Sequence, residues 1–118
     1  MPECRASAPF EVKHPSGAPP YALRFEVDGK VLGFTGDTEW VEAVVPAGRG
    51  ADLYIMECYQ FEGVPRYHMS WKRIAAELDR IGAKRVMLTH MADAMLAQRG
   101  EVKDPRAIFA EDGLVLEV

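Results

Sequence analysis

Two histidines and one aspartate stand at positions where a metal site could use them. His14 and His90 each close a short strand-like run, and Asp37 follows a third such run, in Gly36-Asp37-Thr38. Groups at the strand ends of an α/β sheet gather in one crevice, where ligands bind. Because histidine and aspartate are the usual ligands of zinc and related metals, these three residues predict a metal site.

The remaining histidine, His68, differs from the others because it lies in a loop just before a helix-like stretch. A loop histidine at the crevice could donate a proton to a leaving group or stabilise an oxyanion. The alternative is a surface histidine. Glu57, at the end of an apolar run, could form a hydrogen bond that orients a metal-ligating residue, or it could face water.

Each candidate also has an ordinary structural interpretation. An aspartate after glycine is commonly a turn or capping residue, as Asp37 would be. A strand-end histidine such as His90 is often structural. His14 precedes a proline, and loop histidines are common. Arg49 and Arg66 could meet an anionic substrate but are expected to be solvated. The three strand-end residues together predict a site more strongly than each does alone.

Composition limits the function. At 118 residues the chain forms one domain with a modest core. Its net charge of -4 gives no electrostatic reason to expect nucleic acid or an anionic membrane surface. No apolar run approaches the roughly 20 residues of a membrane span, and the N-terminus lacks a signal-peptide core. We therefore expect a cytoplasmic protein without membrane partners, and two free thiols at Cys4 and Cys58.

The expected elements form one mixed α/β layer. Residues 1–9 show no periodicity and predict a flexible tail ahead of a single domain at 10–118. Asp28-Gly29 predicts a two-residue hairpin, and Ser70 a helix N-cap. A hairpin followed by strand, helix and strand indicates a mixed sheet. We expect strands at 10–14, 21–27, 30–35, 51–57 and 84–89, helices at 39–47, 71–81 and 92–98, and a closing strand pair at 104–110 and 114–118.

Several of these segments, in this order, resemble the metallo-β-lactamase-fold hydrolases, most of all their ribonuclease Z and cyclic-phosphodiesterase branch. The matching segments are Val12-Lys13-His14, Gly36-Asp37-Thr38, the strand at 51–57, His68-Met69-Ser70 and Leu88-Thr89-His90. The resemblance covers residues 10–118. It implies the C-terminal half of an αββα sandwich, a mixed β-sheet with helices on one face.

The resemblance also implies a role for each candidate residue. His14 and His90 would each be a terminal ligand of one metal ion, and Asp37 would bridge the two ions. His68 would act on the leaving group or on the transition-state phosphate. The cofactors would be two divalent ions, zinc first and manganese as the alternative. A hydroxide between them would be the nucleophile, since metal ions lower the pKa of bound water.

One departure from the family pattern limits the expected activity. Members of this family carry a His-x-His-x-Asp-His cluster upstream that supplies further ligands, and this sequence has no such cluster. We therefore expect the chain to be part of a dinuclear hydrolase for a small-molecule or nucleotide phosphodiester. Alone it would bind metal weakly or not at all and would be inactive or nearly so.

Two other functions are possible for such a chain. It could be a non-catalytic half-domain that self-associates as a homodimer or pairs with the missing half, because a cut half exposes the apolar face that the other half would cover. It could also be a receiver-like domain with Asp37 as phosphoacceptor. The Asp28-Gly29 hairpin disfavours the receiver, which begins with alternating parallel strands and helices.

Overall fold

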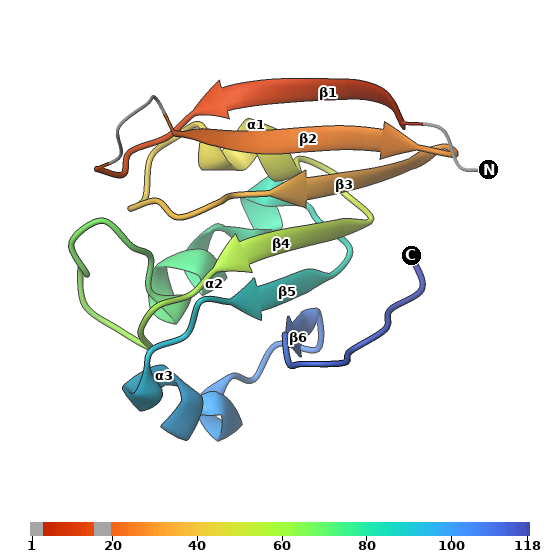
Figure 1. Cartoon of the computed structure of the whole chain (residues 1–118). Coiled ribbons are helices and arrows are strands. Elements are labelled where there is room, and N and C mark those ends of the chain that lie inside the picture. Colours follow the sequence, from red (N-terminus) through yellow and green to blue (C-terminus); the bar gives the residue numbers. More distant parts are fainter. Residues whose placement is uncertain (1–3, 16–19) are drawn as a thin grey trace.

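The computed structural model describes residues 4–15 and 20–118, and within them the strands form one mixed sheet (Figure 1). The sheet order β1-β2-β3-β4-β5-β6 is the order of the sequence. β1, β2 and β3 pair antiparallel, whereas β3 to β6 pair parallel. The mixed sheet predicted from the sequence is therefore confirmed. The strands are β1 (Cys4–Glu11), β2 (Tyr21–Val27), β3 (Lys30–Phe34), β4 (Leu53–Glu57), β5 (Val86–Thr89) and β6 (Ala107–Phe109).

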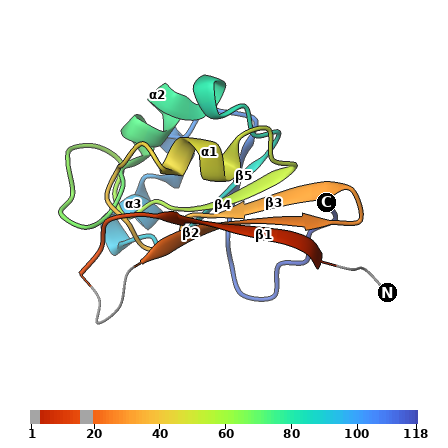
Figure 2. The ribbon, with the colours of Figure 1, turned by 90° about the horizontal axis from the view of Figure 1, so that it is seen from above.

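Two helices, α1 (Val44–Gly48) and α2 (Trp71–Ile81), cover the same face of the sheet (Figure 2). A short helix, α3 (Asp93–Ala97), follows β5, and a 3-10 turn, η1 (Arg99–Glu101), follows α3. The prediction of helices on one face is met by α1 and α2. Among the described residues, every helix is too short or too polar to span a bilayer.

The β2–β3 hairpin forms at the turn that its sequence predicts. Asp28 and Gly29 have φ values of 50° and 77°. Positive φ at both central residues of a two-residue loop matches the right-handed twist of the flanking strands. The turn sets the register that pairs Val27 with Lys30, and with it the position of β3 beside β4.

Helix α2 also begins and ends where its sequence predicts. The Ser70 hydroxyl accepts a hydrogen bond from the Arg73 amide (3.3 Å) and caps the first turn. Gly82 takes a left-handed conformation, with φ 73°, and its amide donates to the carbonyl of Leu78. The apolar stripe of the helix is buried against the sheet, through Trp71, Ile74, Leu78 and Ile81.

The core between the helices and the sheet is organised around Tyr54 in β4. Tyr54 is fully buried, and its hydroxyl donates to the carbonyl of Val44 in α1 (2.6 Å). Its ring lies so close to Gly48 that a Cβ on that residue would come within 2.0 Å of the ring carbons. Glycine at position 48 therefore allows α1 to pack directly on β4.

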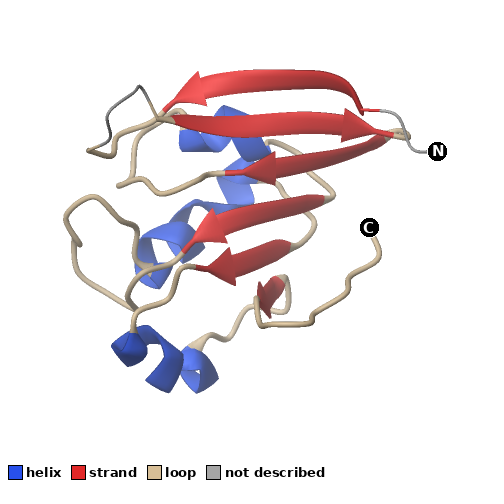
Figure 3. Ribbon diagram, in the orientation of Figure 1, coloured by secondary structure: helices blue, strands red, loops and turns tan. Residues whose placement is uncertain are grey.

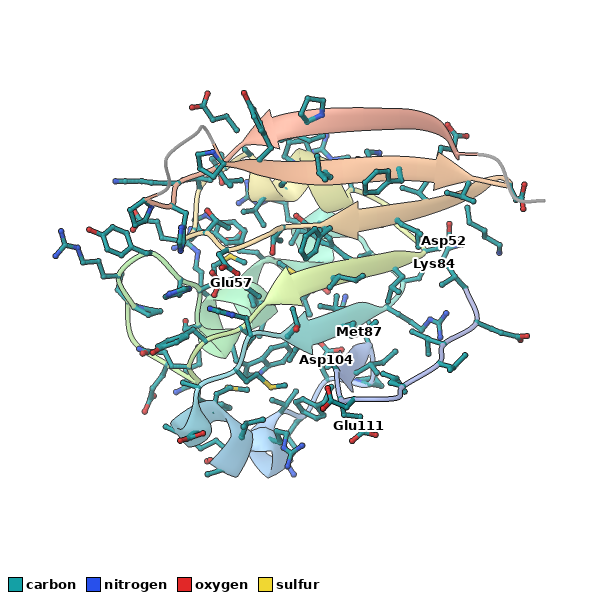
Figure 4. All side chains as sticks on the ribbon, viewed as in Figure 1. Asp52, Glu57, Lys84, Met87, Asp104 and Glu111 are labelled. Carbon is teal, nitrogen blue, oxygen red and sulfur yellow. The ribbon has the colours of Figure 1, made fainter. Side chains whose placement is uncertain are left out.

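The opposite face of the sheet is apolar and only partly covered. In β2, Ala22 is fully buried on the helix side, whereas its neighbour Tyr21 is 47% exposed. Side chains alternate between the two faces of a strand, so Leu23 and Phe25 share the face of Tyr21. Phe34, paired with Leu23 in the next strand, is 40% exposed. This open face also includes Leu32, Ile55 and Met87; Met87 is labelled in Figure 4.

The predicted tail at 1–9 is wrong for the residues that the structure describes. β1 begins at Cys4 and pairs with β2 up to the Glu11–Tyr21 pair. It ends at Glu11, so the strand predicted at 10–14 is shifted toward the N-terminus. Pairing with the strongly amphipathic β2 supplies the order that the local sequence of β1 does not indicate. The part of the predicted tail at residues 1–3 lies outside the described part of the chain.

The helix predicted at 39–47 is also wrong in its first half, because α1 begins at Val44. Thr38 does not cap it. Instead its hydroxyl accepts a hydrogen bond from the Lys13 amide (3.0 Å), and the Glu39 amide donates to the Lys13 carbonyl (3.1 Å). These bonds form an isolated antiparallel bridge between residues 13 and 39, which holds the backbone there extended.

The closing strand pair predicted around Asp112-Gly113 is not found. β6 spans only Ala107–Phe109 and pairs parallel with β5. Residues 114–118 form no strand with it, although the Glu117 carbonyl accepts a hydrogen bond from Arg85. The parallel edge of β5 provides a partner for β6 that the hairpin pattern at 112–113 does not reveal.

Candidate metal centre

The candidate residues converge at one edge of the sheet. β1, β3, β4 and β5 run in the same direction, so their carboxyl ends meet at this edge (Figure 1). His14 follows β1, Asp37 follows β3 and His90 follows β5. The long loop from β4 to α2, which contains His68, passes the same edge (Figure 3).

His68 is close to both of the other histidines. Its ring centroid lies 5.5 Å from that of His14 and 5.0 Å from that of His90. Nδ1 of His90 and Oδ1 of Asp37 are 3.9 Å apart. The structure thus brings together all four residues that the sequence nominated, with His14 joined to the set through His68.

Glu57, at the end of β4, holds His68 in place. Its Oε1 accepts hydrogen bonds from His68 Nδ1 (2.9 Å) and from the Thr38 amide (2.7 Å), and its Oε2 accepts from the Met69 amide (3.1 Å). The carboxylate is almost completely buried, with 1% of the side chain exposed. Figure 4 labels it at the end of β4. The interpretation of Glu57 as a strand-end carboxylate that faces water is therefore wrong.

The hydrogen bond between His68 Nδ1 and Glu57 Oε1 sets the tautomer of His68 when Glu57 is ionised. Because a carboxylate only accepts, the proton must lie on Nδ1, which leaves Nε2 as the second ring nitrogen. Burial raises the pKa of the Glu57 carboxyl, since desolvation outweighs the lowering by the bonds from Met69, His68 and Thr38. The pair is therefore a buried carboxylate behind a partly exposed imidazole.

Tyr59 is a site residue that the sequence did not nominate. Its ring stacks on His68, with centroids 4.5 Å apart and planes at 15°, and lies 6.0 Å from the ring of His90. The Tyr59 amide donates to the Met69 carbonyl (2.9 Å), which brings the two ends of the loop together. The isolated parallel bridge between Gln60 and Ser70 also joins these two ends of the loop, so the stack depends on contacts that no local pattern indicates.

His90 has a left-handed backbone, with φ 57°. Such a conformation is uncommon for residues other than glycine, although asparagine, aspartate and histidine adopt it more often than the rest, and it is concentrated at functional sites. The carbonyl of the preceding residue, Thr89, accepts a hydrogen bond from the Cys58 amide (2.8 Å). The chain therefore turns sharply just after β5, at the position where the sequence predicts a ligand.

The separation of His90 and Asp37 is close to the one that a shared divalent cation needs. Zinc lies about 2.0–2.2 Å from nitrogen and carboxylate donors, so two donors of one tetrahedral ion stand about 3.3–3.6 Å apart. His90 Nδ1 and Asp37 Oδ1 are 3.9 Å apart, so a small closing movement of the two side chains would place both on one ion. His14 Nδ1 lies 3.1 Å from the Pro15 carbonyl and can donate to it, which leaves Nε2 for a metal.

The donors do not form a complete site within this chain. Across residues 4–15 and 20–118, no cluster of three or more His, Cys, Asp or Glu side chains is arranged to hold an ion. Cys58 adds no ligand, because its thiol is buried and burial raises its pKa to about 12. The structure therefore contains one pair of metal donors, His90 and Asp37, with His14 as a third donor nearby. The fourth component is the hydrogen-bonded pair of His68 and Glu57.

Comparison with known proteins identifies the family and the fold of the chain. The family model described as the beta-lactamase superfamily domain matches residues 4–91. No curated protein matches the chain. Among solved structures, the metallo-beta-lactamase fold protein YhfI from Bacillus subtilis has a TM-score of 0.76 at 21% identity, over 97% of this chain and 51% of its own.

Two further solved structures show the same fold. A diphosphatase from the PhnP family has a TM-score of 0.74 at 20% identity, over 98% of this chain and 46% of its own. Human tRNase Z, short form (ELAC1), has a TM-score of 0.69 at 22% identity, over 94% and 42%. The chain thus spans about half the length of these structures. With most of its length matched by the family model, the chain belongs to the beta-lactamase superfamily and has the metallo-beta-lactamase fold.

Proposed function

We propose that the sheet edge described above is part of the active site of a dinuclear metal-dependent hydrolase that cleaves a phosphodiester. The observation that carries this proposal is the convergence of Asp37 and His90 with the Glu57–His68 pair. Two of the solved structures with this fold are a diphosphatase and a tRNase, which supports a phosphate ester as the substrate.

The proposed metal-binding roles are those that the family resemblance implies for these residues. Asp37 would contribute to both ions, because a carboxylate can bridge, and His90 and His14 would each hold one ion. Zinc is the first choice for imidazole and carboxylate donors, and manganese is the alternative. When bound, the ions would activate a water molecule for attack and offset the charge of the phosphate.

His68 is the proposed proton donor. The Glu57 carboxylate, 2.9 Å from Nδ1, orients the ring, so that Nε2 is the nitrogen that would donate a proton to the leaving oxygen. Stacking on Tyr59 limits rotation of the ring. Its side chain is 19% exposed, so it is reachable from the crevice.

The proposed ligand set is incomplete without residues from outside this sequence. All three histidines already have roles, and three ligands shared between two ions leave each ion short of the four that zinc prefers. The open face of the sheet, with Tyr21 and Phe34 exposed, is where the complementary half of the sandwich would pack.

Fragment complementation tests this function. The chain is assayed against bis(p-nitrophenyl) phosphate with zinc or manganese, alone and mixed with a fragment that carries a His-x-His-x-Asp-His cluster. We expect turnover only in the mixture, abolished by Asp37→Asn and lowered about 10²–10⁴-fold by His68→Ala. Asp112→Asn, which removes an exposed turn carboxylate, is the matched control. Strong turnover by the chain alone, or turnover insensitive to Asp37→Asn, would refute the proposal.

The second candidate is a non-catalytic half-domain that self-associates or pairs with a partner chain. The open apolar face favours it, because an exposed hydrophobic face is commonly an interaction surface. This function needs neither metal nor His68. Association that is unchanged by chelator and by His68→Ala, in a chain that no fragment activates, would favour it over the hydrolase.

A further inference from the structure

The ring of His68 is held by two contacts that act in different directions. Its Nδ1 donates to Glu57 Oε1 (2.9 Å), and a ring N–H lies in the plane of the ring. Its face stacks on Tyr59, with centroids 4.5 Å apart and planes at 15°. Both contacts come from one short segment, because Tyr59 follows Glu57 by two residues.

The hydrogen bond alone would not fix where Nε2 of His68 points. The torsion that turns an aromatic ring about its Cβ bond is broad, so a histidine ring can tilt about a single hydrogen bond. A flat partner on the face of the ring removes this freedom, because a tilted ring would lose the stacking contact. The in-plane bond and the stacked face together define the position of Nε2, the nitrogen of the proposed proton transfer.

Among the described residues, Tyr59 is the aromatic side chain that lies parallel to His68. The rings of His14 and His90 are also near, with centroids at 5.5 Å and 5.0 Å, but their planes are inclined to that of His68 by 66° and 36°. An inclined ring does not set the plane of its neighbour. The orientation of the His68 ring therefore depends on Tyr59.

The backbone of Tyr59 is itself tied to both segments that carry these histidines. Its amide donates to the carbonyl of Met69, the neighbour of His68 (2.9 Å). Its carbonyl accepts from the amide of Ala92, two residues after His90 (2.9 Å). The Tyr59 ring also lies 6.0 Å from the His90 ring. Tyr59 thus lies where the two segments meet, and its place is fixed relative to both.

We propose that Tyr59 is a positioning residue for the hydrolysis, and that its ring rather than its hydroxyl holds the His68 imidazole in the plane that directs Nε2 into the site. The inference rests on the hydrolase function proposed above. Because the ring supplies the stacking contact, phenylalanine should replace Tyr59, whereas an aliphatic side chain should not.

The placement of the ring is tested in the chain alone, without metal or turnover. The ring current of an aromatic side chain shifts protons over its face upfield, so the ring protons of His68 report the stack. In EDTA at a single pH, with the His68 resonances assigned through His68→Asn, we expect Hε1 and Hδ2 to move downfield in Tyr59→Leu and to stay near their wild-type positions in Tyr59→Phe.

The control for this shift is Phe25→Leu, which removes a ring from the open face of β2, close to the hairpin turn. We expect it to leave both His68 resonances unchanged. Equal shifts in Tyr59→Leu and Phe25→Leu would overturn the proposal.

A measurement on the wild-type chain keeps the test valid if Tyr59→Leu does not fold. Centroids 4.5 Å apart bring the protons of two rings within range of the nuclear Overhauser effect. We expect cross-peaks between the ring protons of Tyr59 and those of His68, and their absence would also overturn the proposal.

Kinetics of the complemented protein separate positioning from a merely structural role. A misplaced proton donor slows the chemical step without weakening the binding of substrate. We expect Tyr59→Leu to lower kcat about tenfold or more with KM nearly unchanged, and Tyr59→Phe to retain most of kcat. An equal loss in both variants would assign the effect to the hydroxyl and contradict the proposal.

The two sets of measurements distinguish failure of this inference from failure of the proposed function. Turnover that Tyr59→Leu leaves intact would reject the positioning role of Tyr59 alone. The stack of Tyr59 on His68 in a protein that shows no turnover in any mixture would reject the hydrolase alone.

Discussion

Glu57 joins three separate segments through hydrogen bonds. Its oxygens accept from the backbone amides of Thr38, after β3, and Met69, before α2, and from the ring of His68. All three bonds are made by a side chain that is 1% exposed. The residue that orients the proposed proton donor therefore also holds the loop that carries it.

Removal of the Glu57 carboxylate is expected to destabilise the protein. Glu57→Ala leaves two amides without their acceptor, at about 1–3 kcal/mol for each buried group. We expect the free energy of unfolding, measured by urea denaturation, to decrease by about 2–4 kcal/mol. The free energy of unfolding of Glu57→Gln should lie between that of Glu57→Ala and that of the wild type. Glu111→Ala, which removes an exposed carboxylate, is the control. Equal stability of Glu57→Ala and this control would contradict the account.

The sequence nominated His14, Asp37, His68 and His90, and the structure places them at one edge because parallel strands end together. Their roles as ligands and proton donor stay predictions. Tyr59 could not be nominated, because its stacking on His68 depends on a bond between residues at opposite ends of a loop.

At the level of elements, the contact between α1 and β4 depends on Gly48. Gly48→Ala would place its Cβ within 2.0 Å of the Tyr54 ring carbons, and that ring is fully buried. Because neither element can move without breaking the core, we expect a loss of about 1–3 kcal/mol in the free energy of unfolding. Gly100→Ala, where a Cβ meets nothing within 4 Å, should leave the urea midpoint nearly unchanged. A similar midpoint for both variants would show that α1 adapts.

The segment before β6 is stabilised by a pH-dependent ion pair. Asp104 accepts from Arg106 at 2.8 Å, and this hydrogen bond holds the pKa of Asp104 below its usual value. A carboxyl with a lowered folded-state pKa stabilises the fold above its unfolded pKa, near 4, and this stability is lost as the pH falls further. We expect Asp104→Asn to lower the melting temperature at pH 7 and to match the wild type near pH 2. An equal deficit at both pH values would assign the effect to packing.

The elements that the sequence predicted well carry their own local signals. Ser70 and Gly82 bound α2, and Asp28-Gly29 defines the hairpin, so neither depends on distant residues. β1 and β6 were misplaced because their partners, β2 and β5, determine where they pair. The first half of the helix predicted at 39–47 is absent because the bridge between residues 13 and 39 holds the backbone there extended.

At the level of the whole molecule, α1 and α2 cover one face of the sheet, and the opposite face is only partly covered, with the C-terminal segment on its side (Figure 2). The open face carries aromatic and aliphatic side chains from several strands, with Phe34 40% exposed among them. The solved structures that match nearly all of this chain are about twice its length. An exposed apolar surface of this kind favours association.

We expect the isolated chain to self-associate through the open face. Light scattering should show a mass that rises with concentration, and Phe34→Glu should shift the equilibrium toward monomer by placing a charge on this face. Leu96→Glu introduces the same charge at an exposed position of α3 and is the control. A monomer at every concentration, or equal effects of the two variants, would count against association through this face.

The sheet order has a consequence for how the molecule is made. In the described sheet, each strand pairs only with its neighbours in the sequence, so its formation does not require a strand that is distant in the sequence. The hairpin of β2 and β3 can close as soon as both have left the ribosome, and β4, β5 and β6 can then add to a growing edge, one after another. Synthesis from the N-terminus thus follows the same direction as growth of the sheet.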